Sequence, residues 1–131
     1  MDVNLINIMT LAYLGDAIYE VYIREHLIKN GIAKVEELQR DAVKYVSAKA
    51  QAKILDNLVE HDILTDIEID IVKRGRNYKR ASHPRNTDIM TYKLSSGFEA
   101  LIGYLYMDNQ IDRLNEIMDY ILGGNYEKEN N

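Results

Sequence analysis

Two stretches of this chain are apolar around most of a helical circumference, and each contains a carboxylate. Asp16 lies in the stretch 11–20, and Glu99 lies in the stretch 97–106. With about 3.6 residues per helical turn, apolar side chains fall both beside these carboxylates and on the opposite faces. A helix that is apolar all round is normally buried, where an unpaired carboxylate is costly or becomes protonated. Both carboxylates therefore need a partner, and a divalent metal ion is one candidate.

Apolar periodicity predicts helices over almost the whole chain, because a single proline and seven glycines leave few breaks in 131 residues. The expected helices run from Asn4 or Thr10 to Lys29, from Lys34 through Val46, from Ala48 to Val59, from Thr65 through Val72, from Thr87 to Met107, and from Ile111 to Gly123. The fold class is therefore predicted to be all-α. We expect one domain over residues 1–122 and a polar, disordered tail over residues 123–131.

Local signals set several of the expected helix boundaries. Asn30 and Gly31 predict the end of the first helix, because glycine readily adopts the left-handed conformation of a helix cap. Thr65 and Glu68 have the spacing of a capping box. Gly75 and Pro84 predict that a loop replaces the helix over about 75–86.

Positive charge is concentrated in one segment of an otherwise acidic chain. The formal net charge is −5, yet residues 73–86 contain no acid and 6 of the 16 basic side chains. The six are Lys73, Arg74, Arg76, Lys79, Arg80 and Arg85. A basic loop on an acidic body can attract a polyanion locally.

The composition also limits the chemistry and the compartment. The absence of cysteine excludes disulfides, zinc–thiolate sites and thiol nucleophiles. The N-terminal residues lack the pattern of a signal peptide, and no apolar run approaches the roughly 20 residues needed to span a bilayer. We therefore expect a cytoplasmic protein with no membrane partner.

Five short segments resemble motifs of one enzyme family. Residues 13–20, Tyr-Leu-Gly-Asp-Ala-Ile-Tyr-Glu, resemble the signature helix of ribonuclease III, and residues 99–103, Glu-Ala-Leu-Ile-Gly, resemble its second acidic motif. Residues 47–53, 74–77 and 86–88 are similar to segments of the compact Mini-III branch. The resemblance covers about residues 5–122.

The resemblance implies a helical endonuclease domain that works as a homodimer and hydrolyses phosphodiester bonds of double-stranded RNA with Mg²⁺, leaving 5′-phosphate and 3′-hydroxyl ends. Asp16 and Glu99 match the motif carboxylates, and would be the catalytic metal ligands. Magnesium prefers such oxygen ligands and keeps several waters. The family role implied is maturation of precursor ribosomal RNA of the large subunit.

The chain also departs from the larger family members. Ala12 and Ser96 stand where those enzymes have carboxylates, so one metal ion or two remains open. Glu20 either orients metal-bound water or pairs with Arg24 at helical i+4 spacing. Ser95 and Ser96 lack a nearby base and are expected to pack between helices.

Only 32 residues follow Glu99, so we expect no appended double-stranded-RNA-binding domain. The basic loop would then bind RNA phosphates and 2′-hydroxyls across the minor groove. The candidate RNA-binding residues are Arg74, Arg76, Asn77, Lys79, Arg80, His83, Arg85 and Asn86, extended by Lys49 and Lys53. The alternatives are a catalytically inactive RNA-binding or ribosome-associated scaffold on the same fold, and a helical interaction adaptor.

Overall fold

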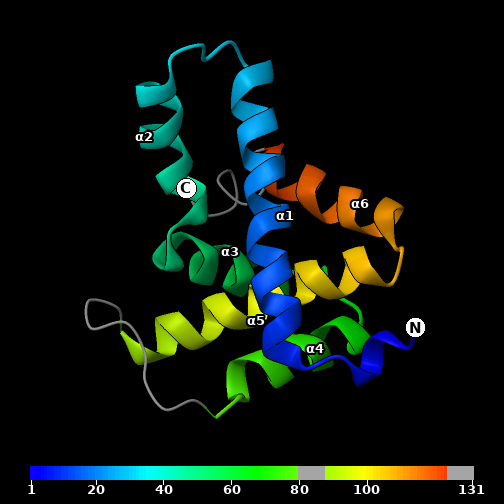
Figure 1. Ribbon diagram of the computed structural model, residues 1–131. Helices are drawn as coiled ribbons and strands as arrows, with labels where there is room; N and C mark the ends of the chain where they lie inside the picture. Colours follow the sequence, from blue (N-terminus) through cyan, green and yellow to red (C-terminus); the bar gives the residue numbers. More distant parts are fainter. Residues whose placement is uncertain (80–87, 124–131) are drawn as a thin grey trace.

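The computed structural model describes residues 1–79 and 88–123, and within them the fold is all-α, as predicted (Figure 1). Six α-helices follow a short 3₁₀ helix at Val3–Leu5. They are α1 (Ile8–Lys29), α2 (Val35–Val46), α3 (Ala48–Glu60), α4 (Asp66–Asn77), α5 (Ile89–Met107) and α6 (Ile111–Leu122). The described residues contain no β-strand.

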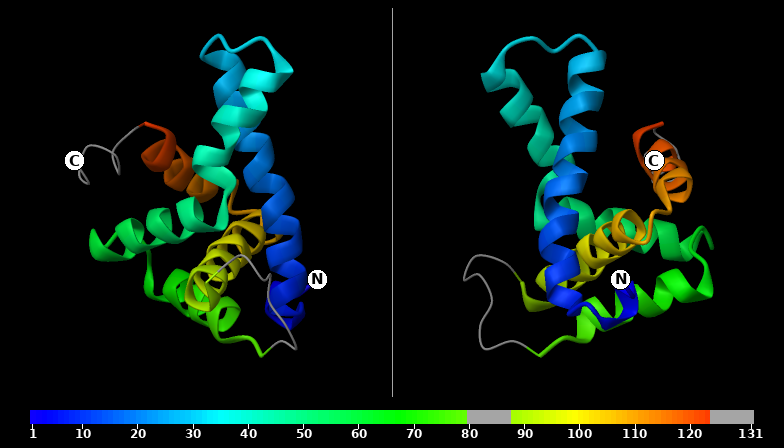
Figure 2. Two further views of the ribbon diagram at one scale, coloured as in Figure 1. Left: turned by 90° about the vertical axis from the view of Figure 1, so that its left-hand side faces the viewer. Right: turned by 45° about the vertical axis from the view of Figure 1, so that its right-hand side comes forward.

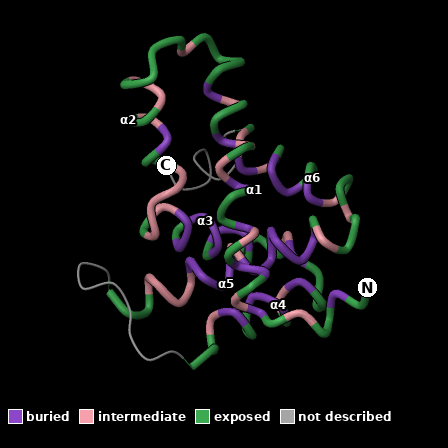
Figure 3. Tube along the Cα trace, in the orientation of Figure 1, coloured by how far each residue is buried: buried purple, intermediate pink, exposed green. Residues whose placement is uncertain are grey.

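Helix α5 is the centre of the core, with α1, α3, α4 and α6 packed around it (Figures 1 and 2). Almost every residue of α5 from 95 to 105 is buried, and Phe98 meets Tyr19 of α1 edge to face, with ring centroids 5.0 Å apart. The distal half of α1 and all of α2 project from this core as a hairpin. Buried residues become sparse along the hairpin (Figure 3), and the predicted turn after α1 places Gly31 at φ +93°.

Helices α1 and α5 cross at two glycines. A Cβ added to Gly15 would overlap the backbone carbonyl of Glu99, and one added to Gly103 would overlap the carbonyl of Leu11. Because both carbonyls belong to the backbone, no side-chain rearrangement can make room for the added Cβ atoms. The two helix backbones therefore approach each other at a distance that only glycine permits.

The prediction that Gly75 ends the helix is wrong, because α4 continues through it to Asn77. Gly75 is buried, and a Cβ there would lie 2.9 Å from the Cα of Gly97 in α5. A Cβ on Gly97 would in turn lie 2.7 Å from the carbonyl oxygen of Val72. Gly75 thus lets α4 pack tightly on α5. The rest of the expected loop, residues 80–87, lies outside the described part, as do residues 124–131 of the expected tail.

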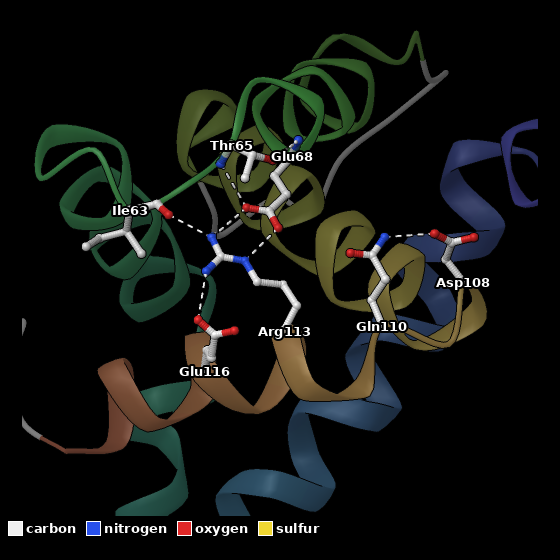
Figure 4. A network of polar contacts seen from close by, with 7 residues as sticks. All are labelled: Ile63, Thr65, Glu68, Asp108, Gln110, Arg113 and Glu116. Carbon is white, nitrogen blue, oxygen red and sulfur yellow. Dashed lines mark hydrogen bonds and ion pairs between the residues drawn. The ribbon is translucent and has the colours of Figure 1, made fainter.

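The capping box at the start of α4 is confirmed, and its acid has a second role (Figure 4). Thr65 and Glu68 exchange hydrogen bonds with each other's backbone N–H. Arg113 of α6 donates its Nε to Glu68 at 2.8 Å and its Nη2 to the carbonyl of Ile63 at 2.7 Å. Burial alone would raise the pKa of the Glu68 carboxyl, but these hydrogen bonds and the Arg113 charge hold it below its ordinary value. The ion pair attaches α6 to the α3–α4 turn.

None of the described helices combines the length and the apolar character needed to cross a lipid bilayer.

The glycine crossing gives a direct stability test. Gly15→Ala should lower the unfolding free energy by about 1–3 kcal/mol or more, because the new methyl group meets backbone that cannot move aside. The matched control is Gly123→Ala at the exposed end of α6, where φ is −74°. The control should change the unfolding free energy by less than about 0.5 kcal/mol. Chemical denaturation measures both values. An equally small loss of unfolding free energy in Gly15→Ala and in Gly123→Ala would contradict the tight crossing.

Candidate active site

The two predicted catalytic carboxylates meet where α1 crosses α5. Gly15, the residue before Asp16, packs against the backbone of Glu99 itself. The close approach of the two helices therefore carries the Asp16 side chain to that of Glu99, and the two carboxyl groups lie within hydrogen-bonding reach. Sequence spacing could not show this contact, because 82 residues lie between Asp16 and Glu99 in the chain.

The assumption that both carboxylates are buried is wrong for Asp16, which is exposed, while Glu99 is partly buried. The buried stripe of α1 passes through Ala12, Gly15 and Tyr19. Asp16 lies at the edge of this stripe, beside the core and open to solvent. One carboxylate of the pair is thus partly enclosed by the protein, and the other is open to solvent.

The pKa of the Glu99 carboxyl is raised from 4.5 to about 8, first by burial and second by the neighbouring Asp16 carboxyl. A hydrogen bond from Gln51 acts in the opposite direction. Among the described residues neither Asp16 nor Glu99 forms an ion pair with a basic side chain. No basic side chain among the described residues therefore balances the negative charge that the two carboxyl groups can carry.

These residues fit a magnesium ion that is bound mainly by water and substrate. Magnesium commonly takes one or two carboxylates and keeps waters or phosphate oxygens at its other positions. Within residues 1–79 and 88–123, no third acid or histidine joins the pair closely enough to complete a metal-binding group. Ala12 and Ser96 are buried and offer no carboxylate. Asp16 and Glu99 are thus the candidate protein ligands.

Glu20 forms an ion pair with Arg24, one of the two roles left open by the sequence. Its Oε2 lies 2.9 Å from Nε of Arg24, one helical turn away. Arg24 itself is largely exposed.

Gln51 of α3 belongs to this site and was missed by sequence reasoning. Its amide is buried and donates Nε2 to Oε2 of Glu99 at 3.2 Å, while its Oε1 accepts from the Ser95 hydroxyl at 2.7 Å. Ser95 is buried between helices as predicted, yet its hydroxyl has this specific partner. Gln51 lies within the motif at residues 47–53, so a signal was present, but no pattern showed which side chain of that motif would face α5.

The basic candidates that the structure describes lie on α3 and on or just after α4, the two helices that pack on α5 near Glu99. Arg74 and Arg76 lie on either side of Gly75, which contacts α5 at Gly97. Nε of Arg76 donates to the side chain of Asn77 at 3.1 Å, and Lys79 follows just after the helix. Lys49 and Lys53 are exposed on α3, on either side of Gln51. The candidates Arg80, His83, Arg85 and Asn86 lie outside the described residues.

The chain is similar to several known proteins. The family model of the ribonuclease III domain matches residues 9–110. A Mini-ribonuclease 3 of Streptococcus pneumoniae is 46% identical over 93% of this chain and 95% of its own length. One from Symbiobacterium thermophilum is 49% identical over 84% of this chain and 83% of its own.

The chain belongs to the ribonuclease III family, in its Mini-ribonuclease 3 branch. It is an endoribonuclease of the ribonuclease III type, the class that cuts double-stranded RNA. A crystal structure of a protein from Fusobacterium nucleatum shares the fold, with a TM-score of 0.82 and 29% identity over 95% of this chain and 98% of that one.

Proposed function

We propose that this endoribonuclease cuts double-stranded RNA with Mg²⁺, for which Asp16 and Glu99 would be the protein ligands. The observation that carries the proposal is the meeting of these two carboxylates at the α1–α5 crossing with no basic side chain among the described residues to neutralise them. A scaffold or an adaptor would have no use for such a pair, since an unneutralised carboxylate beside another disfavours the folded state.

The roles of the two carboxylates differ because their surroundings differ. Glu99 is partly buried and hydrogen-bonded, so it holds a defined position on α5. Asp16 is exposed, so it can be reached by the RNA backbone. When bound, Mg²⁺ supplies the positive charge that polarises the scissile phosphate and makes water a usable nucleophile at neutral pH. We expect products with 5′-phosphate and 3′-hydroxyl ends.

The basic side chains at the end of α4 and on α3 would bind the phosphates of the duplex. The exposed cations are Arg74 on α4, Lys79 just after it, and Lys49 and Lys53 on α3. Both helices contact α5. Arginine and lysine on the rim of a carboxylate pair attract a polyanion that the pair alone would repel. The proposed substrate is precursor ribosomal RNA of the large subunit, processed in the cytoplasm.

Removal of either carboxylate tests the catalytic assignment. Asp16→Asn and Glu99→Gln should each lower the rate of Mg²⁺-dependent cleavage of duplex RNA by more than about 100-fold, because removing a partner of a metal ligand alone costs about 10–100-fold. Gel electrophoresis of an end-labelled duplex measures the rate. Glu116→Gln, an exposed acid of α6, is the matched control and should cleave as the parent does. Undiminished cutting by either site variant would refute the assignment.

The charge at the end of α4 is tested by the salt dependence of binding. Arg74→Ala with Arg76→Ala should weaken duplex binding and reduce the slope of log Kd against log salt by about 0.9 for each phosphate that the variant no longer neutralises. Filter binding in Ca²⁺, at several salt concentrations, measures both quantities. The control pair is Arg40→Ala with Lys44→Ala on α2, where both cations already pair with Asp41. An unchanged slope in the α4 variant would remove these arginines from the RNA interface.

We also propose that the enzyme is a homodimer joined along the outer face of α1. Tyr13, Val21 and Ile28 fall on one side of this helix and are 84%, 59% and 58% exposed. An apolar groove of about 440 Å³ between α1 and α2 continues this face and includes Val35 and Val43. In a symmetric dimer the same patch serves both subunits, so a stripe on one helix can pack against its own copy.

A charge placed on this face should separate the dimer. Val21→Lys is expected to shift the protein from dimer to monomer in sedimentation velocity at micromolar concentration, because a buried unpaired ammonium is costly. Ile67→Lys on α4, at a side chain that is 65% exposed, should leave the dimer intact. A parent protein that sediments only as monomer would contradict the proposal outright.

A further inference from the structure

Gln51 occupies a position that joins three elements of the active site. It is 1% exposed, and it lies in the first turn of α3. Its Nε2 is 3.2 Å from the carbonyl oxygen of Val46 and 3.2 Å from Oε2 of Glu99. Its Oε1 is 2.7 Å from the hydroxyl of Ser95, one turn before Glu99 on α5. Both ends of the amide are therefore occupied.

The chemistry of the partners determines which way the amide points. A backbone carbonyl can only accept a hydrogen bond, so the end of Gln51 that contacts Val46 must be the NH₂ group. That same group faces Glu99 and therefore donates to it. The opposite end must be the carbonyl oxygen, which the Ser95 hydroxyl satisfies by donating. The assignment of nitrogen and oxygen follows from the network and is not arbitrary.

The α2–α3 corner holds this donor in place. Ser47 both ends α2 and caps α3, where its hydroxyl accepts from the backbone N–H of Ala50 at 3.2 Å. The corner turns the Val46 carbonyl back toward Gln51 of the next helix. The amide is thus held by backbone on one side and by α5 on the other. A buried donor fixed in this way directs the carboxylate that accepts from it.

We propose that Gln51 is a positioning residue that orients Glu99 for divalent metal binding, with Ser95 holding the Gln51 amide. This inference rests on the proposed metal site. Gln51 engages one carboxylate oxygen of Glu99 and thereby limits rotation of the group beside Asp16. Without the donor, Glu99 would keep its place in the helix but lose its fixed carboxylate orientation. The metal would then bind a less organised pair.

Binding of Mn²⁺ in the absence of RNA tests the proposal without relying on activity. Electron paramagnetic resonance of free Mn²⁺ during a titration gives Kd for each variant. Gln51→Leu, which removes the amide at similar volume, should raise Kd by about 10- to 100-fold. Ser95→Ala, which removes only the group holding the amide, should raise it by about fivefold. In cleavage assays, both variants should need more Mg²⁺ for half-maximal rate.

Asn57→Leu is the matched control, because Asn57 is a second buried amide on α3, 2% exposed, whose Oδ1 accepts from the Tyr120 hydroxyl away from the carboxylates. Its Kd for Mn²⁺ should stay within about twofold of the parental value. Thermal unfolding of the same variant shows how much stability is lost when a buried amide is removed. An unchanged Kd in folded Gln51→Leu would overturn the role of Gln51. If that variant does not fold, an unchanged Kd in Ser95→Ala overturns it instead.

The two proposals fail in distinguishable ways. If the parent and the double variant Asp16→Asn, Glu99→Gln bind Mn²⁺ equally, the metal site itself is wrong, and the inference about Gln51 falls with it. If the double variant no longer binds Mn²⁺ while Gln51→Leu retains the parental Kd, the metal site stands and only the positioning role is refuted.

Discussion

The close crossing of α1 and α5 is the constraint on which the rest of this structure depends. Gly15 and Gly103 each face the backbone of the other helix, and a methyl group at either position would force the helices apart. The crossing matters for chemistry as well as packing, since Gly15 precedes Asp16 and contacts the backbone of Glu99. A displacement of these helices by the width of a methyl group would separate the two carboxylates. Stability and site geometry thus depend on the same contact.

The second glycine contact gives α5 a partner on another side and places the basic residues. Gly75 and Gly97 bring α4 against α5, so Arg74 and Arg76 begin from a helix that is firmly packed near Glu99. A loop at the same sequence position would hold these cations less firmly. The ion pair between Glu68 and Arg113 then ties α6 to the beginning of α4 (Figure 4). Helix α4 is therefore held by α6 near its beginning and by α5 near its end.

Electrostatic asymmetry distinguishes the two carboxylates of the site. Glu99 is partly buried beside a buried amide, and its raised pKa reflects burial first and the Asp16 carboxyl second. Asp16 is exposed at the edge of the α1 core stripe. A pair of this kind is costly in the free protein and favourable around a cation. The arrangement therefore suits a centre that binds its metal together with an incoming polyanion.

The sequence by itself determined the helical class and most helix boundaries, because these depend on local periodicity and caps, and its short motifs singled out Asp16 and Glu99 as the candidate site residues. It misjudged Gly75, since a glycine that breaks a helix and one that admits a neighbouring helix look the same in one dimension. It also missed Gln51, whose role depends on α3 packing beside α5. Only the tertiary structure decided that Asp16 is exposed, that it meets Glu99, and that the buried amide of Gln51 donates a hydrogen bond to Glu99. Those facts depend on distances between residues far apart in the chain, which local patterns do not encode.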